Sequence, residues 1–266
     1  MIKLVITDLD GTFLNSEGSF DYAYYQQVSQ KMKAAGMSFA ACTGKQCERV
    51  EELFQTAAED VWILGDSATR IKHQGEYVYE SLLPNRLGLE IIERLGQIAN
   101  DHVIIACTPT AAYIHESVNE GDAARVRGSY RILETVAAYK DITDDFVKIT
   151  VYDPKLRCFE HVSQLDRFRS KAYIVASEAA WIDITNQGVH KGTTVARLQE
   201  MLHVAPEETM VFGDGLNDLE LMAAGRYSFA MRNAFDQVKA AAQFVTKSND
   251  ENGVLQTIDL FLDLQQ

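Results

Sequence analysis

Short apolar runs alternate with longer mixed stretches over the first third of the chain. The runs at residues 2–8, 38–42 and 61–64 are almost wholly apolar, as buried strands are. The stretches between them, at 21–35 and 46–56, are predicted to be helices. Strands that alternate with helices form a parallel sheet covered on both faces. The pattern therefore predicts an α/β fold with a doubly wound, Rossmann-like parallel sheet.

The pattern changes after residue 82. Strands are predicted at 103–108, 113–116, 146–152, 172–175 and 181–184, and longer helices at 87–99 and 156–169. Polar Lys148 and Thr150 alternate with apolar neighbours, which is typical of a half-exposed strand. We therefore expect an α+β domain of mainly antiparallel sheet at 83–186, inserted into a core domain made of residues 1–82 and 187–266. No internal repeat is evident.

Two carboxylates close the first strand. Asp8 and Asp10 are separated by Leu9 and followed by a Gly-Thr turn, so both acids can face one pocket at the carboxyl end of the sheet. Two close acids repel each other unless a cation or a shared proton intervenes, and Mg²⁺ accepts a few carboxylates beside water and phosphate oxygens. Taken alone, the segment is explained equally well by a strand-end acid and an ordinary turn.

A second strand, at 209–213, also ends in an acid. Asp214 lies between two glycines, which let the backbone approach an ion or a phosphate closely. Asn217 and Asp218 follow at the start of a predicted helix at 219–224, where one of them would serve as an N-cap. A helix cap would account for one of these polar residues, but not for all three of Asp214, Asn217 and Asp218. A metal site shared by the two strand ends is the better interpretation.

Two other element boundaries suit a phosphate. Thr43 and Gly44 follow the strand at 38–42 and precede a helix, and Lys191 precedes the helix predicted at 193–202. A hydroxyl, backbone N–H groups at a helix start and a lysine ammonium all bind anions. Considered singly, Thr43 is more simply explained as a helix cap and Lys191 as a solvated lysine.

Together these segments, in this order, resemble the four motifs of the haloacid dehalogenase-like phosphohydrolases. The insertion between the second and third motifs resembles the large cap of the Cof-type group (type IIB), and the tail at 228–234, 238–242 and 249–254 is also similar. The resemblance implies that Asp8 is the nucleophile and Asp10 the general acid and base. It also implies that Mg²⁺ is held by Asp8, Asp214 and the backbone carbonyl of Asp10.

The same resemblance assigns the remaining site residues. Thr43 and Lys191 would bind the phosphate together with backbone amides near Leu9 and Gly44, while Asn217 and Asp218 would orient Lys191 and the metal's water. Substrate contacts from the cap are harder to assign, because an ordinary sheet position explains each candidate as well. These candidates are Tyr113, His115, Lys148, Trp181 and Asn186, of which Asn186 is preferred because it lies a few residues before Lys191.

Three residues depart from the family pattern. Lys45 stands where an arginine is commoner, Asp66 where the group often has Asn-Gly-Ala, and Arg232 where a glycine is usual. Each changes charge or bulk beside the expected pocket, and none removes a residue that the chemistry requires. We expect these departures to affect the range of substrates rather than the reaction.

Charge and cysteine content narrow the functional classes. The formal net charge of −13, with no block of Lys or Arg, argues against general nucleic-acid binding. Cys42, Cys47, Cys107 and Cys158 form no pair with metal or redox spacing and are expected to be free thiols in the cytoplasm. No apolar run is long enough for a membrane span. The chain is expected to be a monomer or a weak homodimer.

The expected function is hydrolysis of small phosphomonoesters, such as sugar phosphates or phosphorylated cofactor intermediates. A phosphotransferase or phosphomutase would use the same Asp8 chemistry with another acceptor in place of water. A non-catalytic protein that binds a phosphorylated metabolite is the third alternative. It is disfavoured because Asp8, Asp10 and Asp214 are all present.

Overall fold

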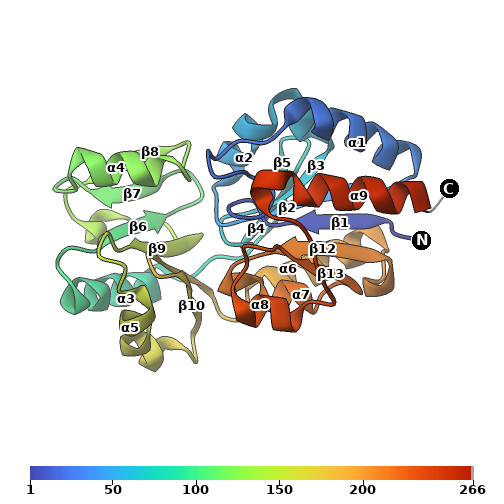
Figure 1. Ribbon diagram of the computed structural model, residues 1–266. Coiled ribbons are helices and arrows are strands. Elements are labelled where there is room, and N and C mark those ends of the chain that lie inside the picture. The colour runs from blue at the N-terminus through green and yellow to red at the C-terminus, as the bar shows by residue number, and fades with distance from the viewer. Residues whose placement is uncertain (265–266) are drawn as a thin grey trace.

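Both ends of the chain contribute to the larger of two sheets in the computed structural model, which describes residues 1–264 (Figure 1). The strand order is β14-β13-β12-β1-β2-β3-β4-β5. Neighbours from β14 to β3 are parallel, and β4 and β5 add an antiparallel hairpin. The predicted parallel core is confirmed, with a hairpin that the sequence pattern did not predict. The strands are β1 (Leu4–Thr7), β2 (Ser38–Cys42), β3 (Val61–Gly65), β4 (Arg70–His73), β5 (Glu76–Glu80), β12 (Thr209–Gly213), β13 (Tyr227–Ala230) and β14 (Phe244–Val245).

Helices cover both faces of this sheet (Figure 1). One face carries α1 (Tyr22–Ala34), α2 (Cys47–Phe54) and α9 (Gly253–Leu264), and the other α6 (Lys191–Leu202), α7 (Leu219–Met222) and α8 (Asp236–Ala241). The helix expected at 46–56 ends at Phe54 and continues as a 3₁₀ segment, Gln55–Asp60, because Gln55 adopts a positive φ of 53°. Aromatic rings from α1, β2 and α2 fill the first interface, among them Tyr25, Phe39 and Phe54.

The second sheet, with its helices, forms the cap. Its strand order is β10-β11-β9-β6-β7-β8, antiparallel except for the β7–β8 pair. One face packs against α3 (Asn85–Ile98), α5 (Cys158–His161) and the 3₁₀ segment Val162–Phe168, and the other against α4 (Glu120–Arg127). The strands are β6 (Val103–Cys107), β7 (Ala112–His115), β8 (Leu133–Val136), β9 (Lys148–Tyr152), β10 (Ala172–Glu178) and β11 (Trp181–Asn186).

The prediction of a half-exposed strand at 148–152 is wrong. Ile149 and Val151 pack under α3 and α5 as the alternation requires, but Lys148 and Thr150 on the opposite face are only 1% and 2% exposed. That face of the cap sheet is turned towards the core, so the polar side chains of β9 are covered by protein instead of bulk water. The polar half of the pattern therefore indicates a buried polar site.

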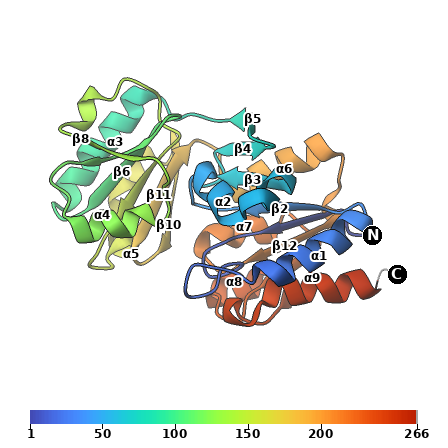
Figure 2. The ribbon, with the colours of Figure 1, turned by 90° about the horizontal axis from the view of Figure 1, so that it is seen from above.

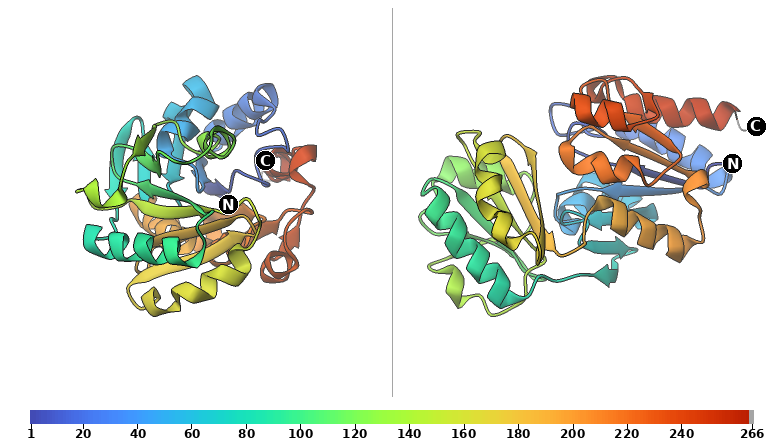
Figure 3. Two further views of the ribbon diagram at one scale, coloured as in Figure 1. Left: turned by 90° about the vertical axis from the view of Figure 1, so that its left-hand side faces the viewer. Right: turned by 90° about the horizontal axis from the view of Figure 1, so that it is seen from below.

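The cap begins and ends at one place. The chain leaves the core after β5 and returns after β11, and both crossings lie on the same side of the molecule (Figures 2 and 3). They touch through a hydrogen bond of 3.1 Å from Asn186 Nδ2 to Ser81 Oγ. The N-terminus lies at the end of the core away from the cap (Figure 3). Within residues 1–264, none of the helices combines the length and the apolar character needed to cross a bilayer.

Two glycines of α3 offer a matched test of packing in the cap. A Cβ at Gly88 would overlap the ring of Phe146, whereas one at Gly96 would meet nothing within 4 Å. We expect Gly88→Ala to destabilise the protein by about 1–3 kcal/mol through overpacking. Gly96→Ala should stabilise the same helix by about 0.5–1 kcal/mol, because alanine is the better helix former. Urea denaturation of both variants measures the difference, and equal effects at the two positions would contradict the packing described here.

Candidate active site

The expected site residues follow four neighbouring strands of the core sheet. Asp214 follows β12, Asp8 follows β1, Thr43 follows β2 and Asp66 follows β3. Because these strands are parallel, their carboxyl ends meet at one edge of the sheet, where ligands bind in open α/β folds. The cap sheet covers this edge (Figure 1).

Lys191 is the buried centre of the acidic cluster. Its Nζ, at the first residue of α6, lies 2.6 Å from Asp8 Oδ1 and 2.6 Å from Asp218 Oδ1. Burial raises the pKa of Asp8 well above its usual range, with Asp218 and Asp214 adding to the effect and Lys191 opposing it. Burial alone would lower the pKa of Lys191, but Asp218 and Asp8 outweigh it and raise that pKa. The ammonium is therefore a permanent positive charge beside Asp8.

Asp214 and Asp218 complete the cluster. Asp218 Oδ2 accepts hydrogen bonds from the backbone N–H groups of Asp214 and Gly215, at 2.9 and 3.0 Å, and so fixes the loop after β12. The carboxylate of Asp214 accepts a 2.7 Å hydrogen bond from Thr12 Oγ1. Burial, reinforced by Asp218, raises the pKa of Asp214 to about 7. Three carboxylates thus share one ammonium, which leaves an excess of negative charge that a divalent cation would balance.

The backbone is shaped to keep these carboxylates close. Oxygens of Asp8, Asp214 and Asp218 lie within 4.8 Å of one another. Gly11 adopts a φ of +75°, and a Cβ at this position would overlap the carboxylate of Asp214. Asn233 Nδ2 donates a 2.7 Å hydrogen bond to the carbonyl oxygen of Gly11 and so holds the turn. A glycine is required here by both the conformation and the close approach.

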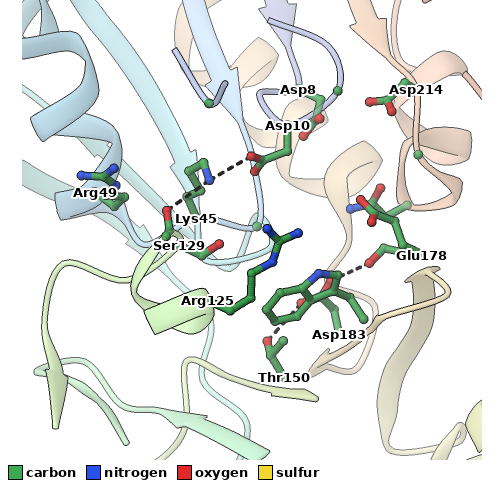
Figure 4. Close-up of a pocket in the computed structure, with 18 of the residues that line it drawn as sticks. Asp8, Asp10, Lys45, Arg49, Arg125, Ser129, Thr150, Glu178, Asp183 and Asp214 are labelled. Carbon is green, nitrogen blue, oxygen red and sulfur yellow. Dashed lines mark hydrogen bonds and ion pairs between the residues drawn. The ribbon is translucent and has the colours of Figure 1, made fainter. Parts of the chain in front are cut away.

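Asp10 points away from this cluster and into the cavity between core and cap (Figure 4). Its carboxylate is half-exposed and lies 2.9 Å from Lys45 Nζ. Lys45 is itself buried and also donates to the carbonyl of Gly128 in the cap, at 3.3 Å. The lysine that departs from the family pattern therefore joins Asp10 to the cap.

The other expected phosphate contacts take different positions. Gly44 and Asn217 line the cavity. Thr43 is buried, and its hydroxyl accepts the backbone N–H of Lys45 at 3.1 Å, so it shapes the loop after β2. The side chain of Leu9 is buried in the core. Asn186 donates to Ser81 where the two crossings meet, and it is not among the described residues that line the cavity.

A cavity of about 550 Å³ lies between the acidic cluster and the cap (Figure 4). The cap supplies side chains of both charges and two aromatic rings to its wall. Of the five cap candidates, Lys148 and Trp181 line it; Tyr113 packs in the cap core, and His115 bonds to Ser117 and the Ala137 carbonyl. Sequence reasoning missed most of this wall, namely Arg125, Ser129, Tyr130, Thr150, Ser177, Glu178 and Asp183.

Hydrogen bonds between cap and core close this cavity. Lys148 Nζ donates to the carbonyl of Gly44 at 2.7 Å and to Ser67 Oγ at 3.1 Å. Gln46 accepts through Oε1 from the backbone N–H groups of Arg131 and Ile132, at 2.9 and 2.8 Å. The described arrangement is therefore a closed one, in which the core loops after β2 and β3 are hydrogen-bonded to the cap.

The loop after β3 is strained and buried. Asp66, Ser67 and Ala68 all have φ between 55° and 63°, a region that favours glycine and asparagine. Asp66 is 2% exposed, and burial raises its pKa to about 6 against the attraction of Lys148 and Arg70. Ser67 donates to Asp183 of the cap at 3.0 Å, which gives this unusual conformation a role in closing the cavity.

Asp66→Asn should stabilise the protein increasingly as the pH rises. The folded-state pKa of about 6 exceeds the ordinary value of 3.8, so folding takes up a proton and wild-type stability falls between these two values. The expected gain is about 3 kcal/mol at pH 8 and about half of that at pH 5. Urea denaturation at both pH values checks this. Asp236→Asn, at a fully exposed side chain, is the control and should change stability by less than about 0.5 kcal/mol. A gain independent of pH would contradict the assignment.

The four cysteines match the sequence prediction. All are free and buried in the described structure. Burial raises the pKa of Cys42, next to Thr43, to about 12, which suits a core residue and not a nucleophile. Arg232 lies outside the cavity and forms an exposed ion pair with Glu251, so its bulk does not reach the site.

Comparison with known proteins defines the class. Residues 5–258 match the family model of the haloacid dehalogenase-like hydrolases. The chain is 30% identical to the 5-amino-6-(5-phospho-D-ribitylamino)uracil phosphatase YbjI of Escherichia coli K12, over 98% of this chain and 96% of that protein. The chain therefore belongs to the haloacid dehalogenase-like hydrolases.

Two solved structures have the same architecture as this chain. The crystal structure of SMU.1108c from Streptococcus mutans UA159 superposes with a TM-score of 0.94 at 28% identity, over 99% of this chain and all of that one. The HAD subclass IIB sugar phosphatase BT4131 gives a TM-score of 0.81 at 19% identity, over 97% of this chain and 98% of that one. The fold is thus that of subclass IIB with its α+β cap, and the protein is a phosphatase of this family.

Proposed function

We propose that this protein hydrolyses small phosphomonoesters in a Mg²⁺-dependent reaction that passes through a phosphorylated Asp8. The observation that carries the proposal is the placement of Asp8 on the floor of the cavity. One oxygen of Asp8 is held by Lys191, and the carboxylates of Asp214 and Asp218 lie beside it. A carboxylate held in this way is a suitable nucleophile for covalent catalysis. We also propose that residues 1–82 and 187–266 form the catalytic domain and 83–186 the cap.

The donor set fits a small hard cation. Asp8 and Asp214 would hold Mg²⁺ through carboxylate oxygens, together with the backbone carbonyl of Asp10. The excess negative charge of the cluster and the glycine that lets Asp214 approach support this assignment. When bound, Mg²⁺ supplies positive charge that stabilises the transferring phosphoryl group. Asp218 would act indirectly, by holding Lys191 and the loop after β12.

The protein's own groups account for the two proton transfers. An Asp8 oxygen attacks phosphorus, the bond to the leaving oxygen breaks, and Asp10 donates a proton to that oxygen. Asp10 then takes a proton from water, which attacks the phosphoryl group, releases inorganic phosphate and regenerates the Asp8 carboxylate. Lys45, at 2.9 Å from Asp10, holds that carboxyl in the cavity. Lys191 offsets the negative charge of the phosphoryl oxygens.

The cavity supports a polar, uncharged substrate body. Arg125 and Glu178 reach towards the acidic cluster from the cap (Figure 4). Trp181 also lines the cavity and adds an indole ring to its wall. Charged side chains of both signs can hydrogen-bond to the hydroxyl groups of a substrate, and an aromatic side chain can pack against a ring of the substrate. Sugar phosphates and 5-amino-6-(5-phospho-D-ribitylamino)uracil, the substrate that the name of the E. coli relative gives, both have this character.

Phosphate release from a panel of phosphomonoesters tests the proposal. The purified protein is treated with a chelator and then assayed with and without added Mg²⁺ on hexose phosphates, nucleotides and 5-amino-6-(5-phospho-D-ribitylamino)uracil. We expect release of inorganic phosphate only with the metal, and the highest kcat/KM for a substrate with a polyol or sugar body. Full activity after chelation would overturn the metal requirement, and transfer of phosphate to a second alcohol at the expense of hydrolysis would favour a phosphotransferase.

A further inference from the structure

A second group of potential metal ligands lies in the cap. His102 immediately precedes β6, Asp153 follows β9, and His161 ends α5. Because β6 and β9 are antiparallel neighbours, with Val103 opposite Tyr152, the first two residues lie at the same edge of the sheet. None of the three is among the described residues that line the active-site cavity. The group is therefore separate from the catalytic centre.

The three ligand atoms have the spacing of a metal site. His102 Nε2 lies 2.9 Å from His161 Nδ1, and Asp153 Oδ2 lies 3.9 and 4.0 Å from these two nitrogens. The point in the plane of the three atoms that is equidistant from them lies about 2.1 Å from each, which is the length of bonds from Zn²⁺ to imidazole nitrogen and carboxylate oxygen. We propose that His102, Asp153 and His161 bind a zinc ion.

The surroundings orient these ligands. The Asp153 carboxylate is fully buried; its Oδ2 accepts from the backbone N–H and Nε of Arg157, and its Oδ1 from Nη2 of the same residue. Outer hydrogen bonds of this kind fix the orientation of a ligating carboxylate. The side chain of His102 is fully buried, and a neutral imidazole is the form that binds a metal ion.

An entry path is also present. The His161 side chain is 14% exposed, so an ion can reach the group from solvent and keep water as a fourth ligand. Two imidazoles and one carboxylate select a transition metal such as Zn²⁺ over Mg²⁺, which prefers oxygen ligands. The donor set thus differs in kind from the all-oxygen cluster around Asp8.

The bound ion would stabilise the cap and its contact with the core. It ties the short helix α5 to two strands of the cap sheet. Phe159 of α5 contacts Phe235 of the core, with ring centroids 6.4 Å apart. Zinc at this position therefore braces the helix that reaches the catalytic domain, without contacting the substrate.

Zinc binding by the full chain tests the inference. The chelator-treated protein is dialysed against Zn²⁺ in excess Mg²⁺, and bound zinc is counted for the wild type, His161→Gln and the control His115→Gln. His115 lies in the same domain, and its side chain hydrogen-bonds to Ser117 and the Ala137 carbonyl, which are not part of the proposed zinc site. We expect one equivalent less zinc in His161→Gln than in the other two, with an affinity at least about 100-fold weaker at this site. Equal zinc content and affinity in all three proteins would overturn the proposal.

A spectroscopic measurement on the wild type keeps the test decisive if His161→Gln does not fold. Co²⁺ added in place of Zn²⁺, again in excess Mg²⁺, should give the strong visible absorption of a four-coordinate ion with nitrogen ligands. Only the weak absorption of an all-oxygen site would overturn the proposal. Both readouts are independent of phosphatase activity, so their failure leaves the proposed reaction at Asp8 untouched.

Discussion

Asp8→Asn is expected to lower kcat for phosphate release by at least about 10⁴-fold while leaving the protein folded. An amide cannot attack phosphorus, and Asp218, the other carboxylate bonded to Lys191, is not among the described residues that line the cavity. The variant also removes a buried negative charge beside Asp214 and Asp218, so it should unfold at the same temperature as the wild type or above it. Steady-state kinetics and thermal unfolding measure the two effects.

The variant Asp10→Asn distinguishes the catalytic role of Asp10 from that of Asp8. If Asp10 protonates the leaving oxygen, its loss should cost about 10²–10⁴-fold with an alkyl phosphate and much less with p-nitrophenyl phosphate, whose leaving group needs no proton. Asp8→Asn should be equally inactive on both substrates. An Asp8→Asn variant that keeps more than a hundredth of the wild-type rate with added Mg²⁺ would contradict the assigned nucleophile.

Lys191→Met is expected to destabilise the protein by about 3–5 kcal/mol at pH 7 in the presence of a chelator. The lysine lies 2.6 Å from both Asp8 and Asp218, and all three side chains are buried, so methionine would leave two carboxylates without a counter-charge. Adding Mg²⁺ should recover part of the loss, because the ion would neutralise the same carboxylates. Urea denaturation with and without Mg²⁺ measures both quantities.

Lys33→Met is the matched control for this variant. Lys33 forms an ion pair of 2.5 Å with Asp60, but both side chains are about half-exposed, and such pairs contribute at most about 1 kcal/mol. Its stability should not depend on Mg²⁺. If Lys191→Met were as stable as Lys33→Met in chelator, the buried charge cluster would not have the energetic role described above.

The core of the fold and its catalytic acids follow from local patterns. The apolar runs that became β1, β2, β3 and β12 are buried on both faces, so they stand out as short continuous apolar segments, and each is followed by a polar residue of evident chemistry. Parallel pairing then brings Asp8 and Asp214 together without further assumption. The hairpin β4–β5 could not be predicted in this way because its strands are short and its second strand is largely exposed.

The cap wall could not be predicted by the same means. Arg125 lies on a helix of low amphipathic character, and Asp183 and Glu178 lie on strands where a polar side chain ordinarily faces water. These cap residues line the cavity because the core lies opposite them. The sequence pattern within 83–186 does not show which cap residues face the core. Lys148 illustrates the point, since its buried contacts are with Gly44 and Ser67, which lie on two different core loops.

The hydrogen bond between Ser81 and Asn186 has a consequence for how such enzymes diversify. The inserted segment leaves and rejoins the core at one place, so with respect to the core it is a long connection between β5 and α6 whose two ends are held together. Length and composition can change beyond that base without moving the strand ends that carry Asp8 and Asp214. New substrates can then be acquired by altering roughly the middle of the gene, while the catalytic apparatus is inherited intact.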